Sequence, residues 1–234
     1  MTRIMEQWIQ KVAWLATEQK LPEWVEEGIH HGFEGVSYEL PEAAFSLHQV
    51  HGVHLVEMKQ GMDPSQHPEA DGLWTRDRGV TIAVKTADCV PVLIHHPRLV
   101  MAIHAGWKGM AQDILGSALA VLQQEEIPLQ ECRVAVGSCI SLDSFEIGPE
   151  VIAQFRKGVY GMDEESFAWA STKGAGDRWH LDLGMLAVLR LQRAGWQADQ
   201  ITVIRSCTKK NPLIWHSFRR DGQRAGRNWS WIRR

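Results

Sequence analysis

Three short apolar runs, closely spaced along the chain, constrain the fold more than any other feature of this sequence. They cover residues 80–86, 90–94 and 99–103 and are rich in valine, isoleucine and leucine. Continuous apolar strands of this length are typical of a sheet that is buried on both faces. We therefore expect these runs to form central strands with other elements packed on either side.

Helices and further strands are expected around these runs, without a regular alternation of strand and helix. Apolar residues at helical spacing predict helices at 3–19, 109–124, 149–157 and 181–194. Strand-like runs lie at 45–51, 53–58, 132–136, 201–204, 213–218 and 229–232. This mixture indicates an α+β fold, which we expect to form one domain over residues 1–234.

The overall composition argues against several classes of protein. A formal net charge of −3 provides no basic excess for nucleic-acid binding. The chain has no stretch of about eighteen apolar residues, so no membrane span is expected, and its first fifteen residues lack the apolar core of a signal peptide. The four cysteines form no CxxC pair, which favours free thiols in a reducing compartment. We expect a cytoplasmic protein without nucleic-acid or membrane partners.

One thiol and two imidazoles stand at the edges of the strand-like runs. Cys89 directly precedes the run at 90–94, His104 directly follows the run at 99–103, and His51 ends another strand-like run. The three side chains could hold one zinc or copper ion, or Cys89 and His104 could form a thiolate–imidazole pair. Three protein ligands would leave a coordination position for water or substrate. Each of the three alone is more often a buried core residue, so the hypothesis depends on all three meeting.

Other polar residues near these runs have a functional and a structural interpretation. Asp88 either orients a histidine or caps a turn. Lys108 lies between two glycines before an expected helix, where a phosphate seat or a simple tight turn would fit. Glu146 is either a general acid or base or a charge at a helix entry. Arg219 could clamp a carboxylate or phosphate, whereas Arg220 is expected to pair at the surface.

Several motifs follow one another in the order seen in the laccase-domain proteins. These are also called multicopper polyphenol oxidase-like (YfiH-like) proteins or peptidoglycan editing factors. The chain resembles this family in the segments 49–52, 70–72, 86–92, 104–109, 145–148, 207–208 and 217–221. The resemblance implies a single domain with mixed β-sheets between helices, related to the catalytic domain of cytotoxic necrotising factor. It also implies that His51, Cys89 and His104 bind one zinc ion, or copper.

The implied activity is on purine nucleosides: phosphorolysis of adenosine, inosine or methylthioadenosine, and deamination of adenosine. The partners would be a nucleoside and phosphate. Our expected site residues are His51, Cys89, His104 and Asp88 for catalysis, and Lys108, Glu146 and Arg219 for substrate binding.

Three alternatives stay open. The first is a Cys–His hydrolase that edits a peptidoglycan precursor, the second a copper-dependent polyphenol oxidase, and the third a metal-binding protein without turnover. The paired histidines at 30–31 and 95–96 are not spaced like additional copper sites. The chain also departs from the family pattern. Residues 31–37 lack the arginine of the usual Thr-Arg-x-Gly-Gly-Val-Ser element, and Lys108 stands where arginine is commoner.

Overall fold

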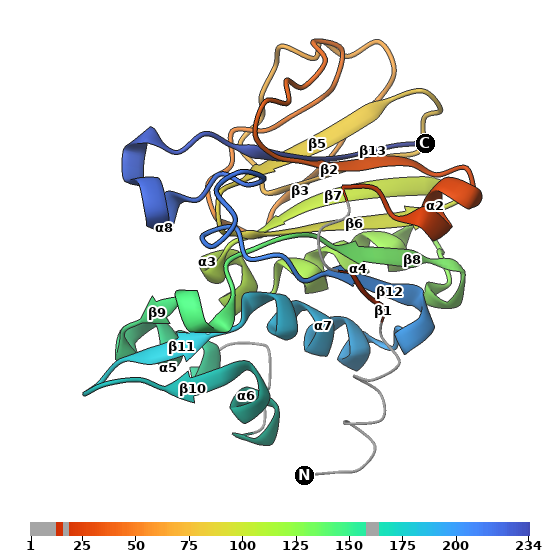
Figure 1. Cartoon of the computed structure of the whole chain (residues 1–234). Coiled ribbons are helices and arrows are strands. Elements are labelled where there is room, and N and C mark those ends of the chain that lie inside the picture. Colours follow the sequence, from red (N-terminus) through yellow and green to blue (C-terminus); the bar gives the residue numbers. More distant parts are fainter. Residues whose placement is uncertain (1–12, 16–18, 158–163) are drawn as a thin grey trace.

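The computed structural model describes residues 13–15, 19–157 and 164–234 and contains three β-sheets in this part of the chain. The largest sheet lies between a layer of helices and one of the smaller sheets (Figure 1). The strands of the largest sheet are β1 Ala13–Leu15, β3 Leu55–Glu57, β4 Gly72–Thr75, β6 Val90–His96, β7 Leu99–Ala105, β8 Arg133–Val136 and β12 Ile201–Ile204. Their order across this seven-stranded sheet is β1-β12-β8-β6-β7-β4-β3. The sheet is mixed, because β12 pairs in parallel with β1 and β8 whereas β6 pairs antiparallel with β7 and β8.

The two faces of this sheet are buried against different layers. One face packs against α3 Trp107–Ala111, α4 Ile114–Gln124 and α7 Leu183–Ala194. Alternate residues of a strand point to opposite faces, so Val92 and Ile94 lie in the helical core whereas Leu93 lies in the second core. Residues 90–94 and 99–103 thus form central strands covered on both sides, as predicted. Residues 80–86 do not form a central strand, because they lie at the edge of a smaller sheet.

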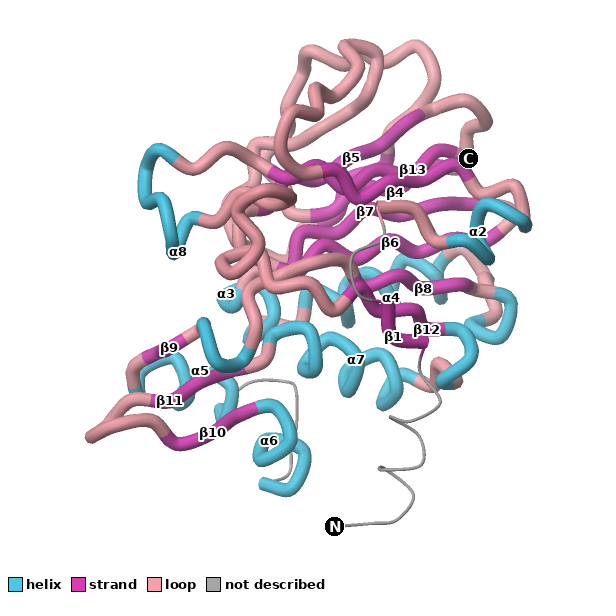
Figure 2. The backbone as a smooth tube through the Cα atoms, in the orientation of Figure 1, coloured by secondary structure: helices cyan, strands magenta, loops and turns pink. Residues whose placement is uncertain are grey.

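A smaller antiparallel sheet covers the second face (Figures 1 and 2). Its order is β2-β13-β5, with bounds of β2 His30–Glu34, β13 Asn228–Arg233 and β5 Thr81–Thr86. The short helix α2 Pro22–Glu26 contributes the fully buried Trp24 to the same core. Gly32 faces Trp231 across β2 and β13, and a Cβ at Gly32 would lie 2.5 Å from the indole nitrogen. Only glycine fits this close approach.

A third sheet projects from one end of the helical layer, as Figure 2 shows. It has the order β10-β11-β9, with bounds of β9 Glu146–Ile147, β10 Ser171–Lys173 and β11 Trp179–Leu181. The remaining helices are α5 Pro149–Lys157, α6 Glu164–Ala170 and α8 Phe218–Asp221. None of the helices in the described part of the chain is long and apolar enough to cross a membrane. The predicted α+β class with mixed sheets is confirmed, whereas the extent of one domain over 1–234 stays a prediction.

The helix predicted at 109–124 is divided into two. α3 ends at Ala111, and Asp113 adopts a left-handed conformation with a φ of 68°. Its carboxylate accepts the backbone N–H of Gly116 and so caps α4. Arg190 of α7 donates from Nε and Nη2 to the same carboxylate, at 2.6 and 2.8 Å. The side chain of Asp113 therefore competes successfully with continuation of the helix.

Two strand predictions were wrong because side chains bond to backbone groups of the segment, as in the interrupted helix. Residues 45–51 make only isolated bridges, and residues 213–218 form no strand and lead into α8 instead. Both segments use their backbone groups to bind side chains, which periodicity does not reveal. The helix predicted at 3–19 was wrong at Ala13–Leu15, which pairs as β1 with β12, and most of its remaining residues lie outside the described part of the chain.

Candidate metal and active site

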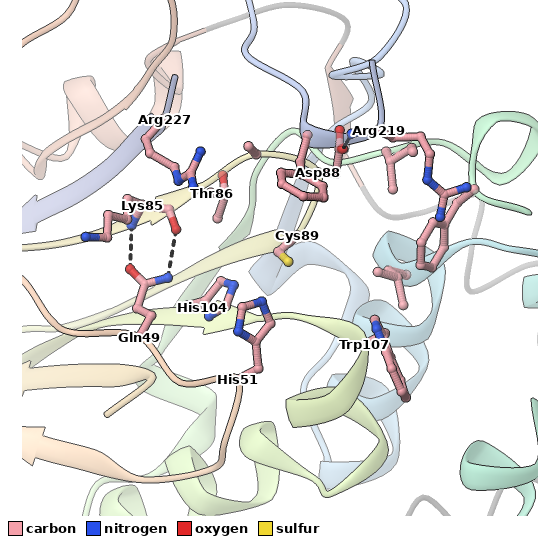
Figure 3. Close-up of a pocket in the computed structure, with 15 residues that line it drawn as sticks. Gln49, His51, Lys85, Thr86, Asp88, Cys89, His104, Trp107, Arg219 and Arg227 are labelled. Carbon is pink, nitrogen blue, oxygen red and sulfur yellow. Dashed lines mark hydrogen bonds between the residues drawn. The ribbon is translucent and has the colours of Figure 1, made fainter. Parts of the chain in front are cut away.

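The three predicted ligands come together where strands of the large sheet end. Cys89 directly precedes β6, and His104 is the next-to-last residue of β7, paired with Pro91 of β6. His51 lies in the loop that precedes β3. One ligand atom from each residue lies within 4.8 Å of the others, and Figure 3 shows both rings beside the Cys89 sulfur. The rings of His51 and His104 meet edge to face with centroids 4.8 Å apart.

The fully buried Asp71 positions both histidines. His104 Nδ1 lies 2.8 Å from Asp71 Oδ1, which leaves Nε2 of His104 to act as a ligand atom. The same carboxylate accepts backbone N–H bonds from Val50, His51 and Gly52 at 3.3, 2.9 and 2.6 Å. These bonds hold His51 at a φ of 62°, a left-handed conformation that is uncommon for residues other than glycine. One carboxylate therefore fixes an imidazole ring and the backbone that presents a second one.

Burial by itself would raise the pKa of Asp71. The hydrogen bonds from His104 and from the backbone of Gly52 and His51 outweigh burial, and the pKa is lowered overall. The carboxylate is therefore ionised at neutral pH and can serve as the fixed negative partner of His104.

Cys89 and His104 shift each other's protonation. Burial alone would raise the pKa of the thiol, but His104 and His51 outweigh burial and lower the pKa of Cys89 from 9.0 to about 6. Burial alone would lower the pKa of His104, but Cys89 and Asp71 raise it from 6.5 to about 9. Both shifts favour the charged forms of the pair, a thiolate and an imidazolium, and a cation bound to the thiolate would replace the histidine proton.

The glycines around Lys108 allow close packing at the site. A Cβ on Gly106 would lie 2.9 Å from His51 Cδ2 and 3.2 Å from Cys89 Sγ. A Cβ on Gly109 would lie 2.7 Å from the carbonyl oxygen of Gly52. The phosphate-binding site predicted as one interpretation of this turn would lie at the N-terminus of α3, a helix of only 5 residues. We attribute the two glycines to the narrow space beside the ligands.

Asp88 bonds to the C-terminal part of the chain and to no histidine among the described residues. Its Oδ1 accepts the Thr208 hydroxyl at 2.6 Å, and its Oδ2 accepts the Arg219 backbone N–H at 2.6 Å. Asp88 has a φ of 93°, so the backbone directly before Cys89 is strained. The two hydrogen bonds hold this conformation, and Asp71 occupies the histidine-orienting position considered for Asp88.

A pocket of about 500 Å³ opens over the three ligands. Apolar side chains line one part of it, including Trp107, Phe145 and Phe218. Arg219 lies over the Phe145 ring, 5.0 Å from its centroid, and donates from Nη1 to the carbonyl of Glu146. Arg227 and Thr86 also line the pocket and lie on the opposite side of Cys89 from Arg219 in Figure 3.

Two of the predicted substrate-binding residues lie outside the lining of this pocket. Lys108 is exposed, and its Nζ lies 5.7 Å from the centroid of the Trp107 ring. Glu146 is exposed, and its carbonyl, rather than its carboxylate, holds Arg219. Arg219 itself lines the pocket as expected. Substrate binding by Lys108 and Glu146 stays a prediction.

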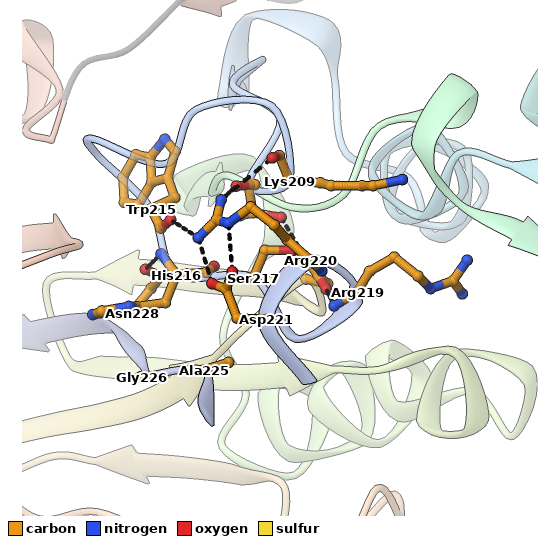
Figure 4. A network of polar contacts seen from close by, with 12 residues as sticks. Lys209, Trp215, His216, Ser217, Arg219, Arg220, Asp221, Ala225, Gly226 and Asn228 are labelled. Carbon is orange, nitrogen blue, oxygen red and sulfur yellow. Dashed lines mark hydrogen bonds and ion pairs between the residues drawn. The ribbon is translucent and has the colours of Figure 1, made fainter. Parts of the chain in front are cut away.

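Arg220 forms a partly exposed ion pair with Asp221, as expected, and also bonds to the backbone of the preceding loop. Its guanidinium bonds to both carboxylate oxygens of Asp221 and to the carbonyls of Thr208, Lys209 and Trp215 (Figure 4). These contacts hold α8 against the preceding loop. Arg220 thereby fixes the position of Arg219 and of its N–H on Asp88.

The sequence alone did not identify four residues of the site, which are Asp71, Thr86, Trp107 and Arg227. Asp71 was part of a quoted family motif, but its role depends on pairing between β4 and β7, which sets Gly72 opposite Ile103. Arg227 lies outside all of the segments in which the chain resembles the family. Neither position carries a local pattern that points to the pocket.

This fold and this ligand cluster agree with the family assignment. The sequence matches the family described as "Multi-copper polyphenol oxidoreductase laccase" over residues 20–234, and the chain belongs to it. A protein of Xylella fastidiosa named "Purine nucleoside phosphorylase" is 34% identical over 193 residues, which cover 80% of this chain and 71% of the relative.

Two further relatives bear on the fold and on the activity. The crystal structure of YlmD from Geobacillus stearothermophilus aligns with a TM-score of 0.76 and 29% identity, covering 82% of this chain and 74% of that chain. A protein from an unknown prokaryotic organism, named "Adenosine deaminase RL5", is 30% identical over 166 residues, covering 70% of this chain and 62% of the relative. The names of the two curated relatives describe enzymes that act on purine nucleosides.

Proposed function

We propose that this protein is a zinc-dependent purine nucleoside enzyme that carries out phosphorolysis of adenosine, inosine or methylthioadenosine and deamination of adenosine. The observation that carries the proposal is the convergence of His51, Cys89 and His104 at the floor of a pocket large enough for a nucleoside. The names of the relatives support the choice of substrate. We keep the cytoplasm as the expected compartment, since all four cysteines are free.

The donor set fits a transition metal. Two imidazoles and a thiolate suit zinc or copper, and Asp71 supplies the carboxylate that commonly orients a ligating histidine. Donor atoms around zinc stand roughly 3–4 Å apart, so ligand atoms within 4.8 Å need only a small contraction. A bound zinc would act as a Lewis acid that stabilises negative charge developing on the substrate.

The residues of the pocket would bind and orient the nucleoside. In phosphorolysis a phosphate oxygen forms a bond to C1′ of the ribose while the bond between C1′ and N9 breaks. The purine leaves with the electron pair and takes up a proton. Trp107, Phe145 and Phe218 offer flat apolar surfaces that would hold a purine ring and exclude water. We assign Cys89, His51 and His104 to catalysis and metal binding, and Asp88 to holding the Cys89 turn.

Product analysis with purified protein tests the proposal. The zinc-loaded protein is incubated with adenosine, inosine or methylthioadenosine, with and without phosphate, and the bases and nucleosides are separated by chromatography. We expect free base and ribose 1-phosphate, or its methylthio analogue, only when phosphate is present, and inosine from adenosine in either condition. Absence of base and of inosine in all conditions, from protein carrying one zinc per chain, would contradict the proposal.

A second candidate is a Cys–His hydrolase that edits a peptidoglycan precursor. The lowered pKa of Cys89 and the contact from His104 to Asp71 favour it, since this is the order of groups in a nucleophile–base–carboxylate set. In this alternative Cys89 would be acylated and added zinc would inhibit. Covalent labelling of Cys89 by an acyl substrate, blocked by zinc, would favour hydrolysis over the nucleoside reaction.

A copper-dependent polyphenol oxidase ranks third. Within residues 13–15, 19–157 and 164–234, His51, Cys89 and His104 are the only group of three or more potential ligands. An oxidase that uses several coppers would need further groups of ligands. Metal analysis of the purified protein, with polyphenol oxidation measured in parallel, tests this alternative.

A further inference from the structure

The hydroxyl of Thr86 is buried and lacks a hydrogen-bond partner. Thr86 is 2% exposed and lines the pocket, and its Oγ1 is one of the few buried side-chain atoms among the described residues without a partner. A buried hydroxyl without a partner destabilises the folded state, so such groups are uncommon. Its presence in the lining of the pocket indicates that a ligand supplies the missing partner.

The residue opposite Thr86 on the neighbouring strand β13 makes no hydrogen bond with the Thr86 hydroxyl. Asn228 of β13 lies directly opposite Thr86 of β5 in the antiparallel ladder. Its amide bonds to the backbone of His216, accepting the N–H at 2.8 Å and donating to the carbonyl at 2.9 Å (Figure 4), and makes no hydrogen bond with the Thr86 hydroxyl. Among the described residues, the Thr86 hydroxyl therefore has no partner on the strand beside it.

The guanidinium of Arg227 lies on the same side of the pocket as Thr86. Arg227 directly precedes β13, so its backbone is adjacent to the residue that faces Thr86. Its Nη1 donates to the carbonyls of Ala225 and Gly226 at 2.8 and 2.9 Å, which orients the guanidinium. Nε and Nη2 make no hydrogen bond with the described residues, and Arg227 lines the pocket together with Thr86. In Figure 3 both lie on the side of Cys89 away from Arg219 and Trp107.

We propose that Thr86 and Arg227 form a phosphate subsite, and that inorganic phosphate, the second substrate of the proposed phosphorolysis, occupies it. A hydroxyl beside an arginine with two unused N–H groups matches the oxygens of a phosphate group. Arg219 is less suited to this role, because it stacks on Phe145 and bonds to the Glu146 carbonyl at the aromatic end. This assignment rests on the proposed function. It places the phosphate and the purine at opposite ends of the pocket.

Matched variants test the subsite. Thr86→Val removes the hydroxyl with little change of shape, Thr86→Ser keeps it, and Arg227→Gln removes the charge. Arg224→Gln is the control, because it removes an exposed arginine of the same loop that does not line the pocket. The zinc-loaded proteins are titrated with inorganic phosphate by calorimetry, and KM is measured separately for phosphate and for the nucleoside. Titration with adenosine 5′-monophosphate distinguishes free phosphate from a phosphate carried by the substrate.

We expect Thr86→Val and Arg227→Gln to raise KM for phosphate at least about tenfold, since each removes a direct or charge-assisted hydrogen bond, with KM for the nucleoside changed less than about twofold. Thr86→Ser and Arg224→Gln should stay near the original values. The melting temperature of unliganded Thr86→Val should not fall, which separates lost binding from lost folding. Unchanged phosphate affinity in both variants, or a loss confined to adenosine 5′-monophosphate, would overturn the subsite.

Failure of the proposed function gives a different result. In that case no nucleoside is converted by any of the proteins, yet calorimetry still reports whether phosphate binds. Phosphate binding that is lost in Thr86→Val and Arg227→Gln would support the subsite even without phosphorolysis. Normal turnover with unaltered phosphate KM would remove the subsite and leave the proposed function intact.

Discussion

Two groups of histidines in this protein behave in opposite ways, although His104 of the first and His31 of the second are buried to a similar extent. At the site, His104 touches Asp71 and lies beside Cys89, and its pKa is raised to about 9. Around Trp24, burial lowers the pKa of His95 to about 4 and also lowers the pKa of His31. Trp24 lies 5.0 Å from the His31 ring and 6.3 Å from the His95 ring, measured between centroids.

The hydrogen bonds explain the difference. His31 accepts the Leu21 N–H on Nε2 at 2.8 Å, and its Nδ1 lies 2.9 Å from the Ile29 carbonyl, which requires a neutral ring. His104 faces a carboxylate and a thiolate, which stabilise a positive charge or a bound cation in its place. Burial alone makes a histidine a neutral structural residue, whereas burial beside anionic groups makes it a potential ligand.

The largest expected effect comes from removing the thiolate. Cys89→Ala leaves two imidazoles, so we expect bound zinc to fall from about one per chain to near zero and nucleoside turnover to fall on the order of 100-fold or more. Elemental analysis and product chromatography measure both quantities. His95→Gln, in the other group, should keep its zinc. A Cys89→Ala protein with normal zinc and turnover would contradict the assignment of the site.

Asp71→Asn sharpens the contrast by changing the carboxylate that contacts both His104 and the backbone of His51. We expect zinc affinity to fall about 10–100-fold, because the amide no longer orients the ring as a carboxylate does. Competition with a chromophoric chelator measures the affinity. Glu131→Gln is the matched control, because Glu131 pairs with the buried His96 at 3.1 Å outside the site. Equal zinc affinities in the two variants would show that Asp71 has no special role.

Gly106→Ala tests the narrow space beside the ligands. The added methyl would crowd His51 and the Cys89 sulfur, so we expect a loss of zinc affinity of a few fold, with the fold retained. Gly184→Ala provides the control, since its methyl would lie at a similar 3.3 Å from the Cys139 sulfur, away from the site. Calorimetric zinc titration compares the two. A Gly106→Ala protein that binds zinc as well as the control would contradict this role.

The smallest expected effect concerns pH. His95 has a folded pKa of about 4 against 6.5 for an unperturbed histidine, so the unfolded chain binds more protons between these values. Its contribution to stability is therefore complete above pH 6.5 and is lost as the pH falls toward 4. His95→Gln should make the free energy of unfolding less dependent on pH in this window, by at most about 1.4 kcal/mol per pH unit.

Urea unfolding at several pH values measures this slope. His48→Gln is the control, because the His48 side chain is 68% exposed. If His95→Gln and His48→Gln change the slope equally, burial does not distinguish the histidines around Trp24.

Much of the central architecture could be predicted from residue order. The apolar runs at 90–94 and 99–103 specify strands buried on both faces, because continuous aliphatic residues leave no face for water. The run at 80–86 forms β5 at the edge of the smaller sheet instead, with Lys85 half-buried. The approximate positions of α5 and α7 followed from apolar spacing. His51, Cys89 and His104 were recognised because thiol and imidazole groups at strand edges, in an ordered set of motifs, are uncommon.

The polar network around the site was decided by tertiary structure alone. Asp71 acts on His104 because β4 lies beside β7, and Asp88 is held by Thr208 and Arg219 from far along the chain. Thr86 lies opposite Asn228, whose amide bonds to the backbone of His216 and not to the Thr86 hydroxyl. Hydrogen bonds of this kind depend on distance and direction in space, and periodicity records neither. Local sequence thus determined which segments were buried, while the packing of distant segments determined which polar groups met.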